Sequence, residues 1–133
     1  MNLHEAYLVV AERSLKAAET LLSDNIQESA TFYSYHAFES MGGALCEKNG
    51  VKYHPKKHPQ KINLFKTVAN QCGIGVGVAT VAIIVASLRN DCLYPNKTPI
   101  GDFDTPDNQI STSNASDMLR RVKGVFRIVK RYV

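Results

Sequence analysis

An uncharged segment of 21 residues, Val68–Leu88, limits the possible folds of this chain more than any other feature. A helix of that length can cross a bilayer. However, the segment contains Asn70 and Gln71 and three glycines at positions 73, 75 and 77, and it is only weakly apolar because it is rich in alanine. We therefore expect a loop at residues 73–77, then a helix from Val78 to about Leu93, buried on most sides in a protein without a membrane span.

The rest of the chain predicts further helices. Apolar residues recur at three- and four-residue steps from Leu3 to Leu22, from Ala30 to Leu45 and from Ala115 to Val129, which is the pattern of amphipathic helices. A loop over Val51–Pro59 precedes a short helix over Gln60–Ala69. Gly42 and Gly43 interrupt the second helix and favour close approach by another helix, the alternative being a local kink.

A buried strand over residues 74–85 is the alternative, but no second segment of period two is present to pair with it. The polar stretch Asn96–Asn114 predicts a long connection, with Ser113 or Ser116 capping the last helix. The fold class is thus all-α: an up-and-down helical bundle of four main helices plus a short extra helix, in one domain spanning residues 1–133.

Charge is segregated along the chain. Residues 1–47 carry two cations and seven acids, residues 48–97 eight cations and one acid, and residues 115–133 six cations and one acid. The two basic segments could form one surface for a polyanion if they lie together, the alternative being an ordinary solvated face.

The N-terminal residues 1–8 lack the features of a signal peptide, so we expect a cytoplasmic protein. Cys46, Cys72 and Cys92 are widely spaced, and this spacing favours buried thiols over a disulfide framework or a zinc site.

The candidate site lies where the uncharged segment ends. Arg89 emerges from the most apolar helix, so its guanidinium must reach a carboxylate or an anion. An ion pair with Glu39 or a contact with a helix end is the structural alternative. Asn90 adds a donor and an acceptor, and Tyr94 is held extended before Pro95. We predict an RNA-phosphate or nucleotide site here.

Two histidine positions are further candidates. Lys57, His58 and Lys61 belong to a basic loop that could contact phosphate, and no thiol or carboxylate lies near enough in sequence to predict a metal. His36 lies on the aromatic helix beside Tyr33, where a structural role is the alternative to a catalytic one. The sequence predicts neither a cofactor nor a metal.

At these residues the chain resembles the HEPN family, the higher-eukaryote and prokaryote nucleotide-binding domain. The resemblance comes from Ala-Glu-Arg-x-Leu-x-x-Ala at residues 11–18, the aromatic helix from Ala30, His58 to Phe65, and Leu88-Arg89-Asn90 to Tyr94-Pro95. It implies a helical bundle that acts on RNA or a nucleotide in toxin–antitoxin, antiphage or RNA-processing systems. It also implies a homodimer in which two arginine motifs face each other.

Family ribonucleases work without a metal through an arginine, a polar residue and a histidine five to seven residues after the arginine. Arg89 and Asn90 match, but Tyr94, Pro95 and Asn96 stand where the histidine is expected. The resemblance therefore implies an RNA-binding protein and leaves a divergent endoribonuclease open, with Tyr94 or His36 in place of the histidine and Tyr33 stacking on a base. The alternative is a non-catalytic module that binds a nucleotide or a partner protein such as a minimal nucleotidyltransferase antitoxin.

Overall fold

The computed structural model describes residues 1–54 and 56–133 and is an all-α bundle, as the sequence predicts. Its long helices are α1 (Leu3–Ser23), α2 (Gln27–Lys48), α4 (Gly75–Leu93) and α6 (Thr112–Val129). The shorter α3 (His58–Gln71) packs against α2 and α4. The short α5 (Pro106–Gln109) and a 3₁₀ turn, η1 (Lys130–Tyr132), complete the described helices. Pro55, part of the predicted loop, lies outside the described residues.

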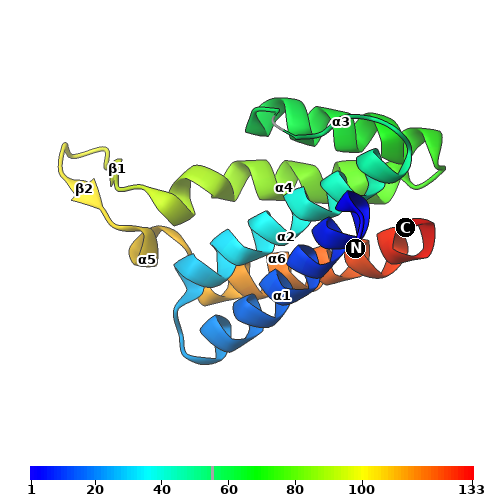
Figure 1. The fold of residues 1–133 in the computed structure, drawn as a ribbon. Helices are drawn as coiled ribbons and strands as arrows, with labels where there is room; N and C mark the ends of the chain where they lie inside the picture. The colour runs from blue at the N-terminus through cyan, green and yellow to red at the C-terminus, as the bar shows by residue number, and fades with distance from the viewer. Residues whose placement is uncertain (55) are drawn as a thin grey trace.

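The four long helices alternate in direction, whereas α3 runs in the same direction as α2 (Figure 1). The chain must therefore return along the bundle between the end of α2 and the start of α3. Pro59 near the start of α3 suits this entry, since a proline in the first helical turn loses no intrahelical hydrogen bond. This return places the first residues of α3 beside the last turns of α4, which run the opposite way.

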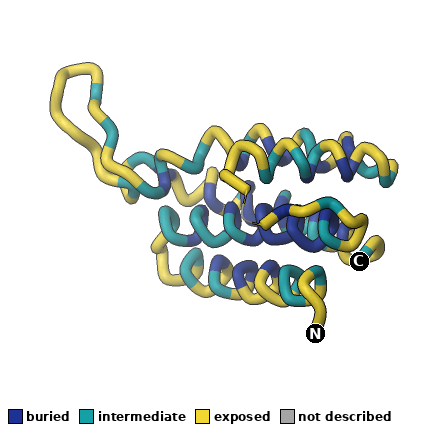
Figure 2. The backbone as a smooth tube through the Cα atoms, turned by 45° about the horizontal axis from the view of Figure 1, so that its top comes forward, coloured by how far each residue is buried: buried dark blue, intermediate teal, exposed yellow. Residues whose placement is uncertain are grey.

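The middle of the bundle is formed by α2, of whose 22 residues fourteen are buried. Figure 2 shows the buried residues gathered in the interior of the bundle. The largest side chains buried there include Tyr53 from the α2–α3 loop, Phe38 and Met41 from α2, Phe65 from α3 and Met118 from α6. Because α2 contacts α1, α3, α4 and α6, it positions every other long helix.

The predicted close approach at Gly42 and Gly43 is confirmed. A Cβ atom on Gly42 would lie 2.7 Å from the Tyr53 hydroxyl and 2.9 Å from Phe65, and one on Gly43 would lie 2.7 Å from the Tyr7 ring. The neighbours are thus aromatic side chains from α1, the α2–α3 loop and α3. Only glycine leaves room for these rings at van der Waals distance.

The prediction for α4 was wrong in two respects. The helix begins at Gly75 instead of Val78, because Gly73, with a φ of +79°, completes the turn from α3 within three residues. It is also not buried on most sides: Val76 is 84% exposed and Ile83 is 71% exposed. By length and composition α4 could cross a membrane, but core helices of soluble proteins can have the same length and composition. Of the most apolar 18-residue stretch of α4, 28% is buried in this bundle.

The segment between α4 and α6 is the long connection that the sequence predicts, and it contains a short hairpin. Residues Asn96–Lys97 (β1) and Phe103–Asp104 (β2) form a two-stranded antiparallel hairpin that projects beyond the end of α4 (Figure 1). The N-cap of α6 is Ser111, whose Oγ accepts a hydrogen bond from the Asn114 amide at 3.0 Å. The cap precedes both predicted serines because Ile110, just before it, is buried against Cys92 and Ala115.

The cysteines form no disulfide. Cys46 and Cys92 are buried, as expected, whereas Cys72 is only partly buried. Burial raises the pKa of the Cys46 thiol to about 12 and that of the Cys92 thiol to about 11. Both are therefore protonated, unreactive thiols at neutral pH.

We expect Gly43→Ala to destabilise the fold by about 1–3 kcal/mol, the range for overpacking a filled core. The new methyl group would displace the Tyr7 ring from its place against α2. Urea unfolding followed by circular dichroism measures the change. The matched control is Gly77→Ala, whose Cβ meets no atom within 4 Å and which we expect to stabilise α4 by about 0.5–1 kcal/mol. Equal stabilisation by both substitutions would contradict the close-approach argument.

Candidate functional site

A buried carboxylate on α2 organises the contact between α2 and the start of α3. The Glu39 side chain is 8% exposed, and its Oε2 lies 2.6 Å from Nδ1 of His58 and accepts a short hydrogen bond from the Tyr35 hydroxyl. Its Oε1 lies 3.4 Å from Nζ of Lys61. The Tyr53 hydroxyl donates to the Glu39 backbone carbonyl at 2.6 Å. Both carboxylate oxygens are thus partnered, as a buried charge requires.

The titration of this cluster follows from those contacts. Burial alone would raise the pKa of Glu39, but the hydrogen bonds from Tyr35 and His58 and the charges of His58 and Lys61 outweigh it and hold the pKa below its ordinary value of 4.5. Burial, followed by the hydrogen bond to Glu39, raises the pKa of Tyr35. At neutral pH Glu39 is therefore ionised and accepts hydrogen bonds, while Tyr35 remains a donor.

A pocket of about 460 Å³ opens beside this cluster, between α2, α3 and α4. Its floor is apolar, and its polar groups come from all three helices. The polar lining residues are Tyr35, His58, Asn63, Lys66, Arg89 and Asn90. None of the lining residues is acidic, whereas two are permanent cations. The pocket therefore favours an anion, and its volume lies within the usual range for small-molecule sites.

Arg89 has no ion-pair partner among the described residues, and its contacts are with an aromatic ring. Its guanidinium carbon lies 5.4 Å from the centre of the Tyr35 ring, a cation–π contact. Its Nε is buried and has no hydrogen-bond partner among the described residues. The alternative of an ion pair with Glu39 is not realised, since Glu39 pairs with His58 and Lys61. A buried donor left unpaired costs about 1–3 kcal/mol, a cost that an anionic ligand would remove.

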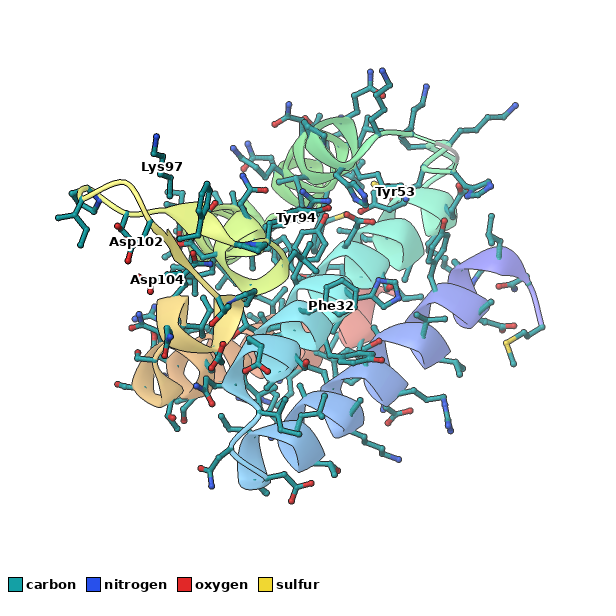
Figure 3. The ribbon with its side chains drawn as sticks, turned by 90° about the vertical axis from the view of Figure 1, so that its left-hand side faces the viewer. Phe32, Tyr53, Tyr94, Lys97, Asp102 and Asp104 are labelled. Carbon is teal, nitrogen blue, oxygen red and sulfur yellow. The ribbon has the colours of Figure 1, made fainter. Side chains whose placement is uncertain are left out.

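The structure brings together only part of the predicted site. Arg89, Asn90 and His58 line the pocket, and Lys61 lies behind it on Glu39. Tyr94 ends α4 beside the hairpin, away from Tyr53 (Figure 3), and does not line the pocket.

The remaining predicted residues lie outside the pocket lining. His36 stacks on Phe32 with the ring centres 6.1 Å apart, and Tyr33 meets the same ring edge-on at 5.3 Å. Lys57 is exposed at the N-cap of α3. The geometry therefore favours His58 over His36 and Tyr94 as the partner of Arg89.

The two basic segments lie on different helices. The basic residues of α3 lie around the pocket, whereas α6 packs on α1, α2 and α4. Among the described residues, no group of three or more His, Cys, Asp or Glu side chains is arranged to hold a metal ion.

A comparison with protein-family models matches residues 4–132 to the HEPN domain. The chain belongs to the HEPN domain family. A comparison with curated proteins found no match, and neither did a comparison with solved structures. The family assignment agrees with the resemblance seen in the sequence and supports a module related to nucleotides or RNA.

Several residues of this HEPN site were not predicted from the sequence. Asn63 and Lys66 line the pocket from α3, and Glu39 contacts the lining residue His58. Asn63 and Lys66 lie one turn or more beyond His58 on the same helix, so a helical-wheel comparison of α3 with Arg89 could have suggested them. Gln109 was also missed: its Nε2 donates to the carbonyl oxygens of Asp91 and Tyr94 at 2.9 Å and so caps α4.

We expect Glu39→Gln to reduce the loss of stability that the HEPN domain shows in acid. The folded-state pKa of Glu39 is lowered, so its stabilisation is fully present above the unfolded-state value of 4.5 and is lost as the pH falls through that value to the lower folded-state pKa. Urea unfolding at about pH 7 and about pH 3.5 measures the difference. The control is Glu12→Gln on the exposed face of α1, which should leave the difference unchanged. An equal acid dependence in wild type and Glu39→Gln would contradict this account.

Proposed function

We propose that this HEPN domain binds single-stranded RNA, with a phosphate against Arg89, in a toxin–antitoxin, antiphage or RNA-processing system. The observation that carries the proposal is the buried Arg89 Nε, which has no hydrogen-bond partner among the described residues, in a pocket whose other permanent charge is Lys66. Asn63 and Asn90 supply donors and acceptors suited to base edges or ribose hydroxyls. Unpaired RNA exposes both phosphates and base edges to such side chains.

The second candidate is a free nucleotide. The pocket volume of about 460 Å³ matches a ligand of that size, and the same arginine would contact its phosphate. The two ligands share the phosphate and differ in chain length, so competition between them separates the candidates.

We further propose that the domain acts as a homodimer through the exposed face of α4. No charged residue occurs in this helix before Arg89, and Val76 and Ile83 are its most exposed apolar side chains. Ile83 and Ala86 also line the pocket, so a second copy on this face would border both pockets. Covering this face removes apolar surface from water, which stabilises the assembly.

Arg89→Ala should weaken binding of a labelled single-stranded RNA by about tenfold or more, because hydrogen bonds to charged groups contribute about 1.5–3 kcal/mol. Fluorescence anisotropy at several salt concentrations measures this, and the slope of log affinity against log salt should fall by about one. The matched control is Arg13→Ala on the exposed surface of α1, which should bind like the wild type.

Unchanged RNA affinity in Arg89→Ala would overturn the RNA proposal. Displacement of the RNA by ATP at low concentration, together with weak binding of RNA that lacks a terminal phosphate, would favour the nucleotide instead.

Ile83→Glu combined with Val76→Glu should convert the protein from a dimer to a monomer of 14.7 kDa. Two carboxylates would have to be desolvated in the proposed interface, which is costly without cationic partners. Light scattering coupled to size-exclusion chromatography gives the mass. Val10→Glu, on the exposed side of α1, is the control and should remain dimeric. A monomeric wild type would refute the proposed interface.

A further inference from the structure

A second basic pocket lies between α1 and α6. Its volume is about 440 Å³, and none of its lining residues belongs to α2, α3 or α4, the helices that line the Arg89 pocket. Its apolar lining residues are Leu22, in the last turn of α1, and Leu119 of α6, and the other lining residues are polar or charged. Leu119 is 5% exposed and Leu22 is partly buried. We call this pocket the α1–α6 groove.

The α1–α6 groove carries an excess of positive charge. Arg120, Lys123 and Arg127 line it together with a single acid, Glu19. Nζ of Lys123 lies 2.5 Å from Oε1 of Glu19, and Arg120 pairs with Asp117 on its own helix. Arg127 has no ion pair among the described residues. The groove can therefore accept at least one further carboxylate.

The β1–β2 hairpin has the opposite charge and exposes apolar side chains. Residues 98–110 contain three acids and no cation. Ile100 is 88% exposed and Phe103 is 67% exposed. Asp102 and Asp104 flank Phe103, and neither forms an ion pair with another described residue. Exposed apolar side chains gathered in one place indicate an interaction surface.

The hairpin is held by hydrogen bonds at its base and within its turn. The Asn96 amide donates to Oε1 of Gln109 at 2.9 Å. In the turn, the Thr98 amide donates to the Asp102 carbonyl at 2.8 Å, and Gly101 has a φ of +96°, which glycine adopts without strain. A segment that is already ordered loses little conformational entropy when it binds a partner.

The groove and the hairpin lie at the same end of the bundle (Figure 1). At that end α1 stops, α4 leads into the hairpin, and α6 begins. Leu22 of the groove also packs against the small cluster around Ile110, the residue that follows α5. Two copies can therefore meet end to end about a two-fold axis, each with its hairpin in the groove of the other. Such a contact is closed and does not continue into a fibre.

We propose that the β1–β2 hairpin of one copy docks in the α1–α6 groove of a second copy, and that the second copy returns the same contact. Phe103 covers the two leucines of the groove, which removes apolar surface from water. Asp104 pairs with Arg127. The charge complementarity calls for an acidic segment with an apolar side chain, and this chain itself exposes one.

This contact is separate from the proposed face of α4 and does not rest on RNA binding. A hairpin tip covers less surface than a long helix face, so we expect the contact at higher protein concentrations than the α4 contact. It then joins two α4 dimers into a larger assembly.

A phosphate chain is the competing occupant of the groove, because cations also attract RNA. Two features favour the hairpin. The apolar base of the groove suits the Phe103 ring, and Glu19 on the same groove would repel a phosphate.

The experiment is sedimentation velocity at protein concentrations from micromolar to millimolar. The mean mass of the wild type should double as the concentration rises. Phe103→Asp in the hairpin and Arg127→Glu in the groove should each weaken this association by about tenfold or more, as loss of a central interface residue does. Both side chains are exposed, so the fold is retained. The matched control is Arg131→Glu, also exposed, which should associate like the wild type.

A mixture of the two variants tests the pairing itself. Phe103→Asp keeps an intact groove and Arg127→Glu keeps an intact hairpin, so an equimolar mixture should restore part of the association that each variant alone has lost. A general loss of solubility or stability would not be restored by mixing.

The other outcomes decide between the alternatives. Constant wild-type mass at every concentration, or a mixture that associates no better than either variant, overturns the proposal. If Arg127→Glu weakens binding of labelled RNA and leaves self-association unchanged, the groove holds nucleic acid and hairpin docking is refuted. A mass that doubles from monomer instead of from dimer supports the hairpin contact and refutes the α4 face.

Discussion

The burial of the Glu39 carboxylate is the interaction on which the arrangement of α2, α3 and the pocket depends. A buried charge is tolerated only when its partners are in place, and here they come from two helices: Tyr35 on α2, and His58 and Lys61 on α3. Loss of any of them would leave a charge desolvated without compensation. The carboxylate therefore fixes where α3 begins, and with it one wall of the pocket.

The path of the chain follows from the same constraint. His58 is the first residue of α3 and contacts the middle of α2, so the chain must return along the bundle after α2 ends at Lys48. Tyr53 holds this returning segment, since its hydroxyl bonds the Glu39 carbonyl and its amide bonds Glu47. As a result α3 runs parallel to α2, and its first turn meets the last turns of α4, where Arg89 lies.

The helices could be predicted because their apolar spacing is a local property of the chain. The close approach at Gly42 and Gly43 could be predicted because a pair of glycines inside a helix has few other uses. The exposed face of α4 could not be predicted, since an uncharged helix has no polar side to show which face meets solvent. The role of Glu39 could not be predicted either. Its partner His58 lies 19 residues away, and periodicity carries no information on contacts across a loop of that kind. Arg89 was found because a lone cation after an uncharged helix is visible in the sequence itself.

The pocket keeps its positive charge because both carboxylate oxygens of Glu39 already have other partners. Glu39 contacts two of the lining residues, Tyr35 and His58, and its two oxygens are occupied by Tyr35, His58 and Lys61. Arg89 lies over the Tyr35 ring instead, and an aromatic ring is a weaker partner for a cation than a carboxylate. Had Arg89 paired with Glu39, its charge would be compensated, and Lys66 would be the remaining permanent cation among the lining residues. Instead, Glu39 orients His58 on α3, and Arg89 on α4 has no ion-pair partner among the described residues.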